Sequence, residues 1–189
     1  SPSDPYAGAY NNTTIETSSD GSYGMYAVSS SRASNYGTIV TSGDNSHGMV
    51  ASDGSWAYNH ADITTNGADA FGMYALNGAG VFNHLGGSIL TSGTDSHGMV
   101  AEGVGSTATN EPGAVIRTTS ADSYGMYALD GGQATNLGEV FTEGLSSHGM
   151  YALDGSIVVN LGTVRTLGAG SHGMVAENGS GSPSDPYAG

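Results

Sequence analysis

Apolar residues recur along this chain at a nearly constant spacing. Every methionine lies in a Gly-Met-(Tyr/Val)-Ala motif, and successive copies of the motif are 24 to 27 residues apart. Around each motif, apolar and polar positions alternate with a period of two, which is typical of β-strands. An internal repeat of this length predicts a solenoid. The methionines are Met25, Met49, Met73, Met99, Met126, Met150 and Met174.

Each repeat contains three short alternating segments. The first starts at the methionine and ends in an Asx-Gly or similar turn, the second ends in asparagine, and the third reads (Ile/Val)-x-Thr. All three are clear in Gly149–His172. The asparagines are Asn11, Asn35, Asn59, Asn83, Asn110, Asn136 and Asn160. The threonines are Thr17, Thr41, Thr65, Thr91, Thr118, Thr142 and Thr166.

Three strands per repeat predict an all-β, parallel β-solenoid with three faces and about seven coils. Near-constant columns should face inward, so Met, Ala, Asn, Ile or Val, and Thr line the interior, and the variable columns between them face outward. At about 4.8 Å per coil, seven coils span about 34 Å. We expect the asparagine amides to form a ladder between coils, and the threonine hydroxyls to do the same.

Charge and composition exclude several classes of function. The chain of 189 residues has 17 acidic residues against three Lys plus Arg, giving a formal net charge of -14. This charge repels nucleic acid and anionic membranes. Without Cys, there is no disulfide framework or thiolate metal site. No apolar run reaches the roughly 20 residues that cross a bilayer, and the first residues do not resemble a signal peptide, so we expect a mature chain or a fragment.

The octapeptide SPSDPYAG occurs twice, at Ser1–Gly8 and at Ser182–Gly189. Its copies are 181 residues apart, and joining the last partial coil to the first restores the asparagine, isoleucine and threonine columns. We therefore expect residues 1–189 to be a single solenoid that covers one period, plus a short overlap, of a longer tandem array. The alternative is a cloning artefact.

The columns N-x-G-x-(I/V)-x-T-x-G followed by S-H-G-M-V-A are seen in Asn35–Ala51 and Asn160–Ala176. They resemble the repeats of autotransporter passenger domains and related bacterial surface adhesins, over Asn11 to Ala176. The resemblance implies a right-handed β-helix that is exported and displayed at the cell surface, where it serves adhesion or aggregation. It implies an extracellular or cell-surface location and does not identify a ligand.

Two sets of side chains are candidate metal ligands. Four histidines share one column with aromatic residues, which favours ring stacking over a metal site; the column is Tyr23, His47, Phe71, His97, Tyr124, His148 and His172. His60 and His84 are neighbours in a second column. Aspartates after the threonine column are candidates for a calcium-binding row, with a solvated turn as the alternative. They are Asp20, Asp44, Asp69, Asp95 and Asp122.

We find no nucleophile motif, phosphate loop or local cluster of catalytic carboxylates, so we do not expect an enzyme or a bound cofactor. The leading hypothesis is a structural extracellular repeat protein that associates with itself end to end as a long fibre. An outward column of Tyr and Val would serve lateral contacts. The alternative is an adhesin module that binds a glycan or a surface receptor through the same aromatic stripe. The tyrosines are Tyr26, Tyr74, Tyr127 and Tyr151.

Overall fold

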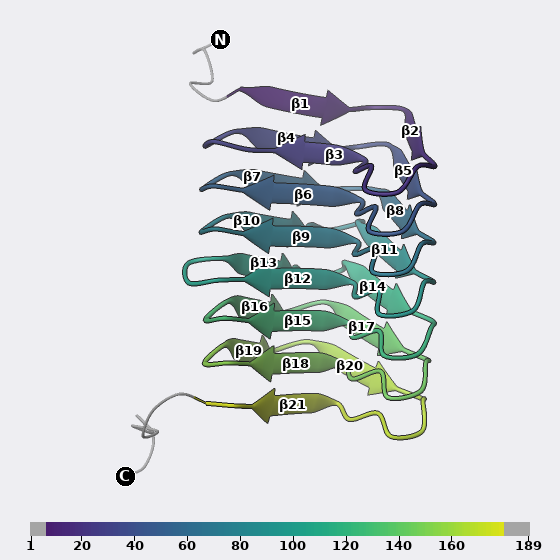
Figure 1. The fold of residues 1–189 in the computed structure, drawn as a ribbon, viewed down its shortest axis with the longest axis vertical. Helices are drawn as coiled ribbons and strands as arrows, with labels where there is room; N and C mark the ends of the chain where they lie inside the picture. The colour runs from purple at the N-terminus through teal and green to yellow at the C-terminus, as the bar shows by residue number, and fades with distance from the viewer. Residues whose placement is uncertain (1–6, 180–189) are drawn as a thin grey trace.

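A computed structural model describes residues 7–179. These residues form 21 short strands and no helix, and the strands fall into three parallel sheets of seven strands each. Each strand pairs with the equivalent strand one coil away, in register, as Figure 1 shows. The predicted three-faced parallel β-solenoid of seven coils is confirmed. Among the described residues there is no helix that is long and apolar enough to cross a membrane.

Sheet A is formed by the segments that end in asparagine. Its strands are β1 (Gly8–Asn11), β4 (Arg32–Asn35), β7 (Trp56–Asn59), β10 (Gly80–Asn83), β13 (Thr107–Asn110), β16 (Gln133–Asn136) and β19 (Ile157–Asn160). Sheet B is formed by the segments that end in threonine. Its strands are β2 (Thr14–Thr17), β5 (Thr38–Thr41), β8 (Asp62–Thr65), β11 (Ser88–Thr91), β14 (Val115–Thr118), β17 (Glu139–Thr142) and β20 (Thr163–Thr166).

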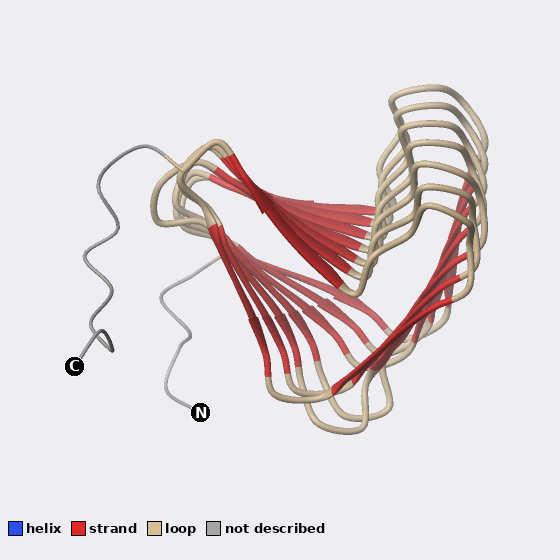
Figure 2. Cartoon of the chain, turned by 90° about the horizontal axis from the view of Figure 1, so that it is seen from below, coloured by secondary structure: helices blue, strands red, loops and turns tan. Residues whose placement is uncertain are grey.

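Sheet C is formed by the segments that begin with methionine. Its strands are β3 (Met25–Ala27), β6 (Met49–Ser52), β9 (Met73–Leu76), β12 (Met99–Glu102), β15 (Met126–Leu129), β18 (Met150–Leu153) and β21 (Met174–Glu177). The chain passes through sheets A, B and C in that order in every coil. Sheet C follows a long loop that carries the histidine and aromatic column (Figure 2).

The solenoid is right-handed. In Figure 1 the chain runs rightward along sheet A at the back and leftward along sheet C at the front while it descends, and the view along the axis in Figure 2 agrees. Connections between parallel strands of one sheet are almost always right-handed, because a right-twisted strand returns to its sheet most easily in that sense.

One continuous hydrophobic core runs along the axis. Each inner coil contributes a methionine and an alanine from sheet C, an alanine or valine from sheet A, and an isoleucine or valine from sheet B. The glycine before each methionine is required by close stacking: a Cβ atom at Gly48 would lie 2.3 Å from Cγ2 of Ile63 and 2.6 Å from the carbonyl oxygen of Gly72. The backbones of neighbouring coils are therefore in direct contact at this glycine.

Candidate functional site

The asparagine column forms a hydrogen-bonded ladder that runs through all seven coils. Each Nδ2 donates to the Oδ1 of the next asparagine, from Asn11 to Asn160, at 2.8 to 2.9 Å. The asparagines of the five inner coils are fully buried. In several coils Oδ1 also accepts a backbone N–H two residues later, as from Gly138 to Asn136. The ladder thus satisfies buried amides and holds the corner between sheets A and B.

The expectation that threonine hydroxyls bond between coils is wrong. In the first six coils each hydroxyl donates to a carbonyl oxygen five residues further along the same coil, as Thr91 does to Ser96 at 2.6 Å. A serine column links these loops instead. The backbone N–H of Ser96 donates to Oγ of Ser123, and that Oγ donates to the carbonyl oxygen of Gly93. Threonine therefore closes each loop, and serine joins neighbouring loops.

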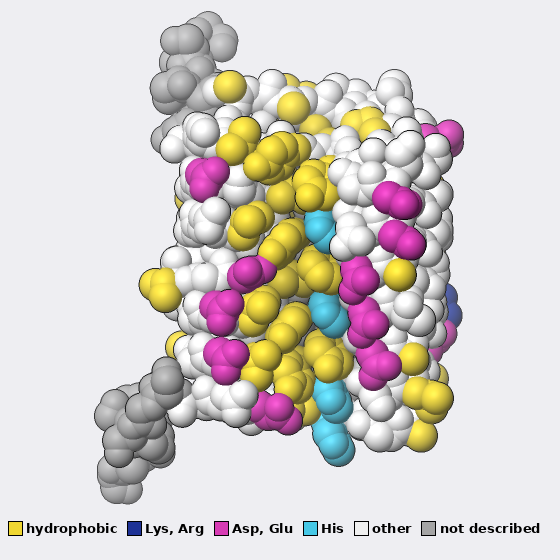
Figure 3. Space-filling view, viewed as in Figure 1, with side chains coloured by type: hydrophobic (Ala, Val, Ile, Leu, Met, Phe, Trp, Pro, Cys, Tyr) yellow, Lys and Arg dark blue, Asp and Glu magenta, His cyan; other side chains and the backbone are white. Residues whose placement is uncertain are grey.

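The histidine and aromatic column is a continuous stack of seven rings. Consecutive ring centroids, from Tyr23 to His172, lie 4.6 to 5.2 Å apart, with interplanar angles of 4° to 23°. We call this column the aromatic ladder. In Figure 3 it lies beside the apolar strip on the face of sheet C, with acidic side chains on both sides.

Two histidines of the ladder are held in the neutral form. Burial lowers the pKa of His47 to about 4 and that of His97 to about 3. The Nδ1 atoms accept backbone N–H groups, from Phe71 to His47 and from Tyr124 to His97, both at 3.0 Å. Because Nδ1 accepts, the proton of the neutral ring lies on Nε2. Burial, and then the neighbouring His172, also lower the pKa of His148. These rings act as stacking groups and hydrogen-bond acceptors.

The outward tyrosine and valine column of sheet C packs on the ladder. Tyr74 stands edge-on to His47 at 5.2 Å, and Tyr127 to His97 at 5.0 Å. Hydroxyl groups are engaged as well: Tyr74 donates to Glu102, and Tyr151 donates to Glu177 at 2.6 Å. The hydrogen bond from Tyr151 to Glu177, followed by burial, raises the pKa of that tyrosine, and burial raises the pKa of Tyr74.

This packing covers much of the column, and its predicted role in lateral contacts stays a prediction. Tyr151 is only 9% exposed and Val100 1%, although both point outward from the sheet. Among the four candidate tyrosines, Tyr26 is the one that stays half exposed, at 51%. Most of the stripe is therefore covered by its own rings. It stabilises the solenoid and leaves little free surface for lateral contacts.

The five candidate calcium ligands do not form one row. Asp20 and Asp44 share a column with Ala68, since the carboxylate of Asp44 accepts the backbone N–H of Ala68 at 2.9 Å. The other three lie one residue later, at a position with positive φ; they are Asp69, Asp95 and Asp122. Burial, and then the neighbouring aspartates, raise the pKa of Asp95. No group of three or more His, Asp or Glu within residues 7–179 is arranged to hold a metal ion.

A second aromatic group, absent from our sequence predictions, lies on the outer face of sheet A. Trp56 and Tyr58 of β7 lie beside Phe82 of β10, with ring centroids 5.8 and 5.4 Å from that of Phe82. The guanidinium of Arg32 lies over the ring of Tyr58 at 5.4 Å. We call these four residues the Trp56 cluster. Nearby, His84 is stacked on His60 at 4.5 Å and paired with Glu111 at 2.5 Å; burial, and then His84, lower the pKa of His60.

A family model described as the BigA third pectate lyase-like domain matches residues 3–112 and, again, residues 60–182. The chain belongs to this family. A search of curated proteins and a search of solved structures each found no similar chain. The two matches to the BigA family overlap because successive coils carry the same columns, so that one model fits in two registers. The family is one of bacterial surface proteins.

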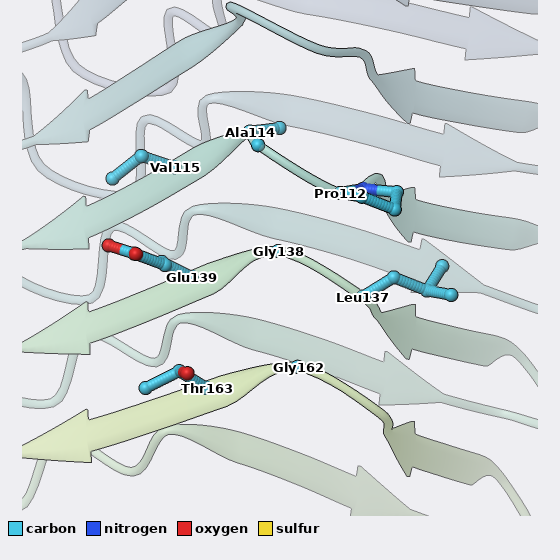
Figure 4. A pocket seen from close by; sticks show the side chains of 9 residues that line it. Pro112, Ala114, Val115, Leu137, Gly138, Glu139, Gly162 and Thr163 are labelled. Atoms are coloured by element: carbon cyan, nitrogen blue, oxygen red, sulfur yellow. The ribbon is translucent and has the colours of Figure 1, made fainter.

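The BigA-type solenoid has a shallow hollow at the corner between sheets A and B (Figure 4). Its lining is mostly backbone and small side chains, and Glu139 is the ionisable residue among those that form it. The side chains of Glu139 and Leu137 diverge in Figure 4. On the adjoining face of sheet B, Arg117 is paired with Glu143 at 2.7 Å, and Phe141 lies between Arg117 and Arg165. These groups satisfy one another instead of converging on the hollow.

Proposed function

We propose that this chain is a structural segment of a bacterial surface protein, in which stacked coils build a stiff extracellular fibre. The observation that carries the proposal is the asparagine ladder, whose six links run through every coil without a break. Here the interior is devoted to axial continuity.

The packing supports mechanical stiffness. Every coil is joined to the next by three parallel strand ladders, by an asparagine bond and by the aromatic ladder, and serine bonds join most neighbouring loops as well. In a solenoid each repeat contacts only its neighbours, so stability is the sum of such interfaces. Bending the rod would stretch one of its sides. The strand hydrogen bonds, side-chain hydrogen bonds and ring contacts on that side would then open. On this interpretation the chain is not an enzyme.

The fibre would consist of tandem periods of 181 residues. Support comes from the repeated octapeptide and from the columns that are restored when the two ends are joined. Most of both octapeptides, residues 1–6 and 182–189, lies outside the described residues. Each period would add seven coils, or about 34 Å, to the axis. Surface display and self-association in this form are similar to those of autotransporter passenger domains, which the repeat columns resemble.

Small-angle X-ray scattering of a chain with two consecutive periods tests the proposal. A continuous solenoid predicts a single rod of about 68 Å, twice the length of one period, with an unchanged cross-section. A one-period chain is the matched control. Two rods that move independently around a flexible joint would contradict it.

A further inference from the structure

The outward columns of sheet A change character along the axis, unlike the inward ones. One row of register partners runs Gly8, Arg32, Trp56, Gly80, Thr107, Gln133 and Ile157. Aromatic residues occur in the first, third and fourth coils of this face, and Thr, Gln, Ile and Val occupy the outward positions in the last three. Because the fold does not require aromatic side chains at these outward positions, the Trp56 cluster is a local addition to the repeat.

Trp56 lies flat on the neighbouring coil. A Cβ atom at Gly80 would be 2.5 Å from Cζ3 of Trp56, so the indole occupies the space that a side chain at Gly80 would fill. The ring is tilted by 34° against that of Phe82, and 37% of the residue remains exposed. The absence of a side chain at Gly80 thus leaves the space that the indole of Trp56 occupies, and part of Trp56 stays open to solvent.

Side chains that can form hydrogen bonds lie on both sides of the indole of Trp56. Arg32 is the register partner of Trp56 on one side, and Thr107 is the partner of Gly80 on the other. Close by, Nδ1 of His84 lies 2.5 Å from a carboxylate oxygen of Glu111. The chain as a whole carries a charge of -14, which opposes the approach of a polyanion. An exposed aromatic ring with polar groups at its edges matches an uncharged, amphipathic ligand.

We propose that the Trp56 cluster binds a pyranose ring of a neutral, β-linked glycan. The C–H face of such a sugar stacks on the indole of Trp56, and its equatorial hydroxyls reach Arg32 on one side and Thr107 on the other. In a β-1,4-linked chain of glucose or xylose every linkage is equatorial, so that the rings present flat faces, whereas bent α-linked chains do not lie along one plane. This binding goes beyond the structural role and does not depend on whether the coils form a fibre.

Trp56 is the single tryptophan of the chain, so its fluorescence reports directly on this site. The intact protein is titrated with cellotetraose, with xylotetraose and with isomaltotetraose as the α-linked comparison. We expect a saturable change in emission with a β-linked tetrasaccharide, at a dissociation constant of about 1 mM or below, and at least tenfold weaker binding of isomaltotetraose. Absence of a saturable response to both β-linked sugars up to about 20 mM overturns the proposal.

Two variants and one control locate the binding. Gly80→Ala keeps the fluorophore but adds a methyl group in the space that its indole occupies. This variant should weaken binding at least fivefold. Trp56→Ala, followed by isothermal titration calorimetry, should weaken it at least tenfold. The control Tyr26→Ala removes an exposed ring from sheet C and should leave the affinity unchanged. Equal affinity in Trp56→Ala and in the unmodified protein would overturn the proposal, as would a fluorescence change caused only by self-association in sedimentation experiments.

Discussion

The aromatic ladder beside sheet C and the Trp56 cluster on sheet A contain similar residues but differ in periodicity and exposure. The ladder places one ring in every coil, and its inner rings are largely covered; His97, for example, is 7% exposed. The cluster is confined to a few coils and leaves Trp56 37% exposed. In a stacked fold, a side chain that recurs in each coil gains a partner above and below. Periodic aromatics therefore stabilise the solenoid, whereas aperiodic exposed ones are free to contact other molecules.

The largest expected effect of a single substitution is on the interior ladder. Asn83→Ala removes both axial bonds of that amide and leaves Asn59 and Asn110 with buried unpaired groups. We expect a loss of about 4 kcal/mol in the free energy of unfolding, from about 1 to 3 kcal/mol for each unsatisfied group. Urea unfolding followed by circular dichroism measures it. Asn12→Ala, at an exposed position outside the ladder, is the control and should change stability little.

Removal of a buried ring from the outward tyrosine and valine column of sheet C should lower the free energy of unfolding nearly as much. Tyr151→Ala deletes a buried ring that contacts Tyr124, Tyr127 and His148. We expect a loss of about 3 kcal/mol, since truncation of a buried aromatic side chain typically costs about 3 to 5 kcal/mol and this ring lies at the surface edge of the packing. Tyr26→Ala, on a half-exposed ring in the first coil, should cost less than half as much in the same assay.

Acid should weaken the aromatic ladder through its buried histidines. His47 and His97 have pKa values of about 4 and 3 in the folded chain, below the value near 6.5 expected in the unfolded chain. The unfolded state therefore binds more protons as pH falls below about 6.5, and stability that is fully present above that pH is progressively lost. From pH 7.5 to pH 5, each histidine should cost about 2 kcal/mol.

His97→Phe tests this pH effect, because Phe71 already occupies the same column in the preceding coil. The variant loses the hydrogen bond from Tyr124, which lowers stability equally at both pH values. Its loss of stability between pH 7.5 and pH 5 should be about 2 kcal/mol smaller than that of the unmodified protein. An equal loss in both proteins would show that the ring of His97 is accessible to protons in the folded state.

The smallest effect on stability should come from the Trp56 cluster. Trp56→Ala removes an exposed ring from the outer face of sheet A, and we expect a loss below about 1 kcal/mol in urea unfolding. This is the opposite of the expectation for Tyr151→Ala. If the two substitutions destabilised the protein equally, the distinction between periodic and aperiodic aromatic groups would fail.

Period-two alternation was sufficient to predict the strands, the three sheets and the inward columns, because it encodes which face of a strand is buried. It could not predict how outward side chains cover one another. The loop that carries the ladder is closed by a bond within the coil from Thr91 and its equivalents, which alternation does not reveal. Alignment by residue type also placed Asp44 and Asp69 in one row. The positive φ angles of Asn45 and Asp69 show instead that Asn45 is the residue equivalent to Asp69.

The sequence contains a sign of the Trp56 cluster that the alternation pattern does not reveal. Outward positions of sheet A vary along the chain, and a single tryptophan followed one coil later by Gly80 departs from the repeat. The contact between that indole and Gly80 depends on register and on side-chain rotamer, which composition does not specify. Departures from a repeat are therefore as informative about recognition as the repeat is about architecture.

Electron microscopy of the native protein tests the central claim most directly. An uninterrupted solenoid of tandem periods predicts straight filaments with a strand spacing of about 4.8 Å along the axis and a longer repeat near 34 Å, the length of one period. Short isolated rods of about 34 Å, without a longer repeat, would contradict it and would leave the chain as a single rod-shaped module.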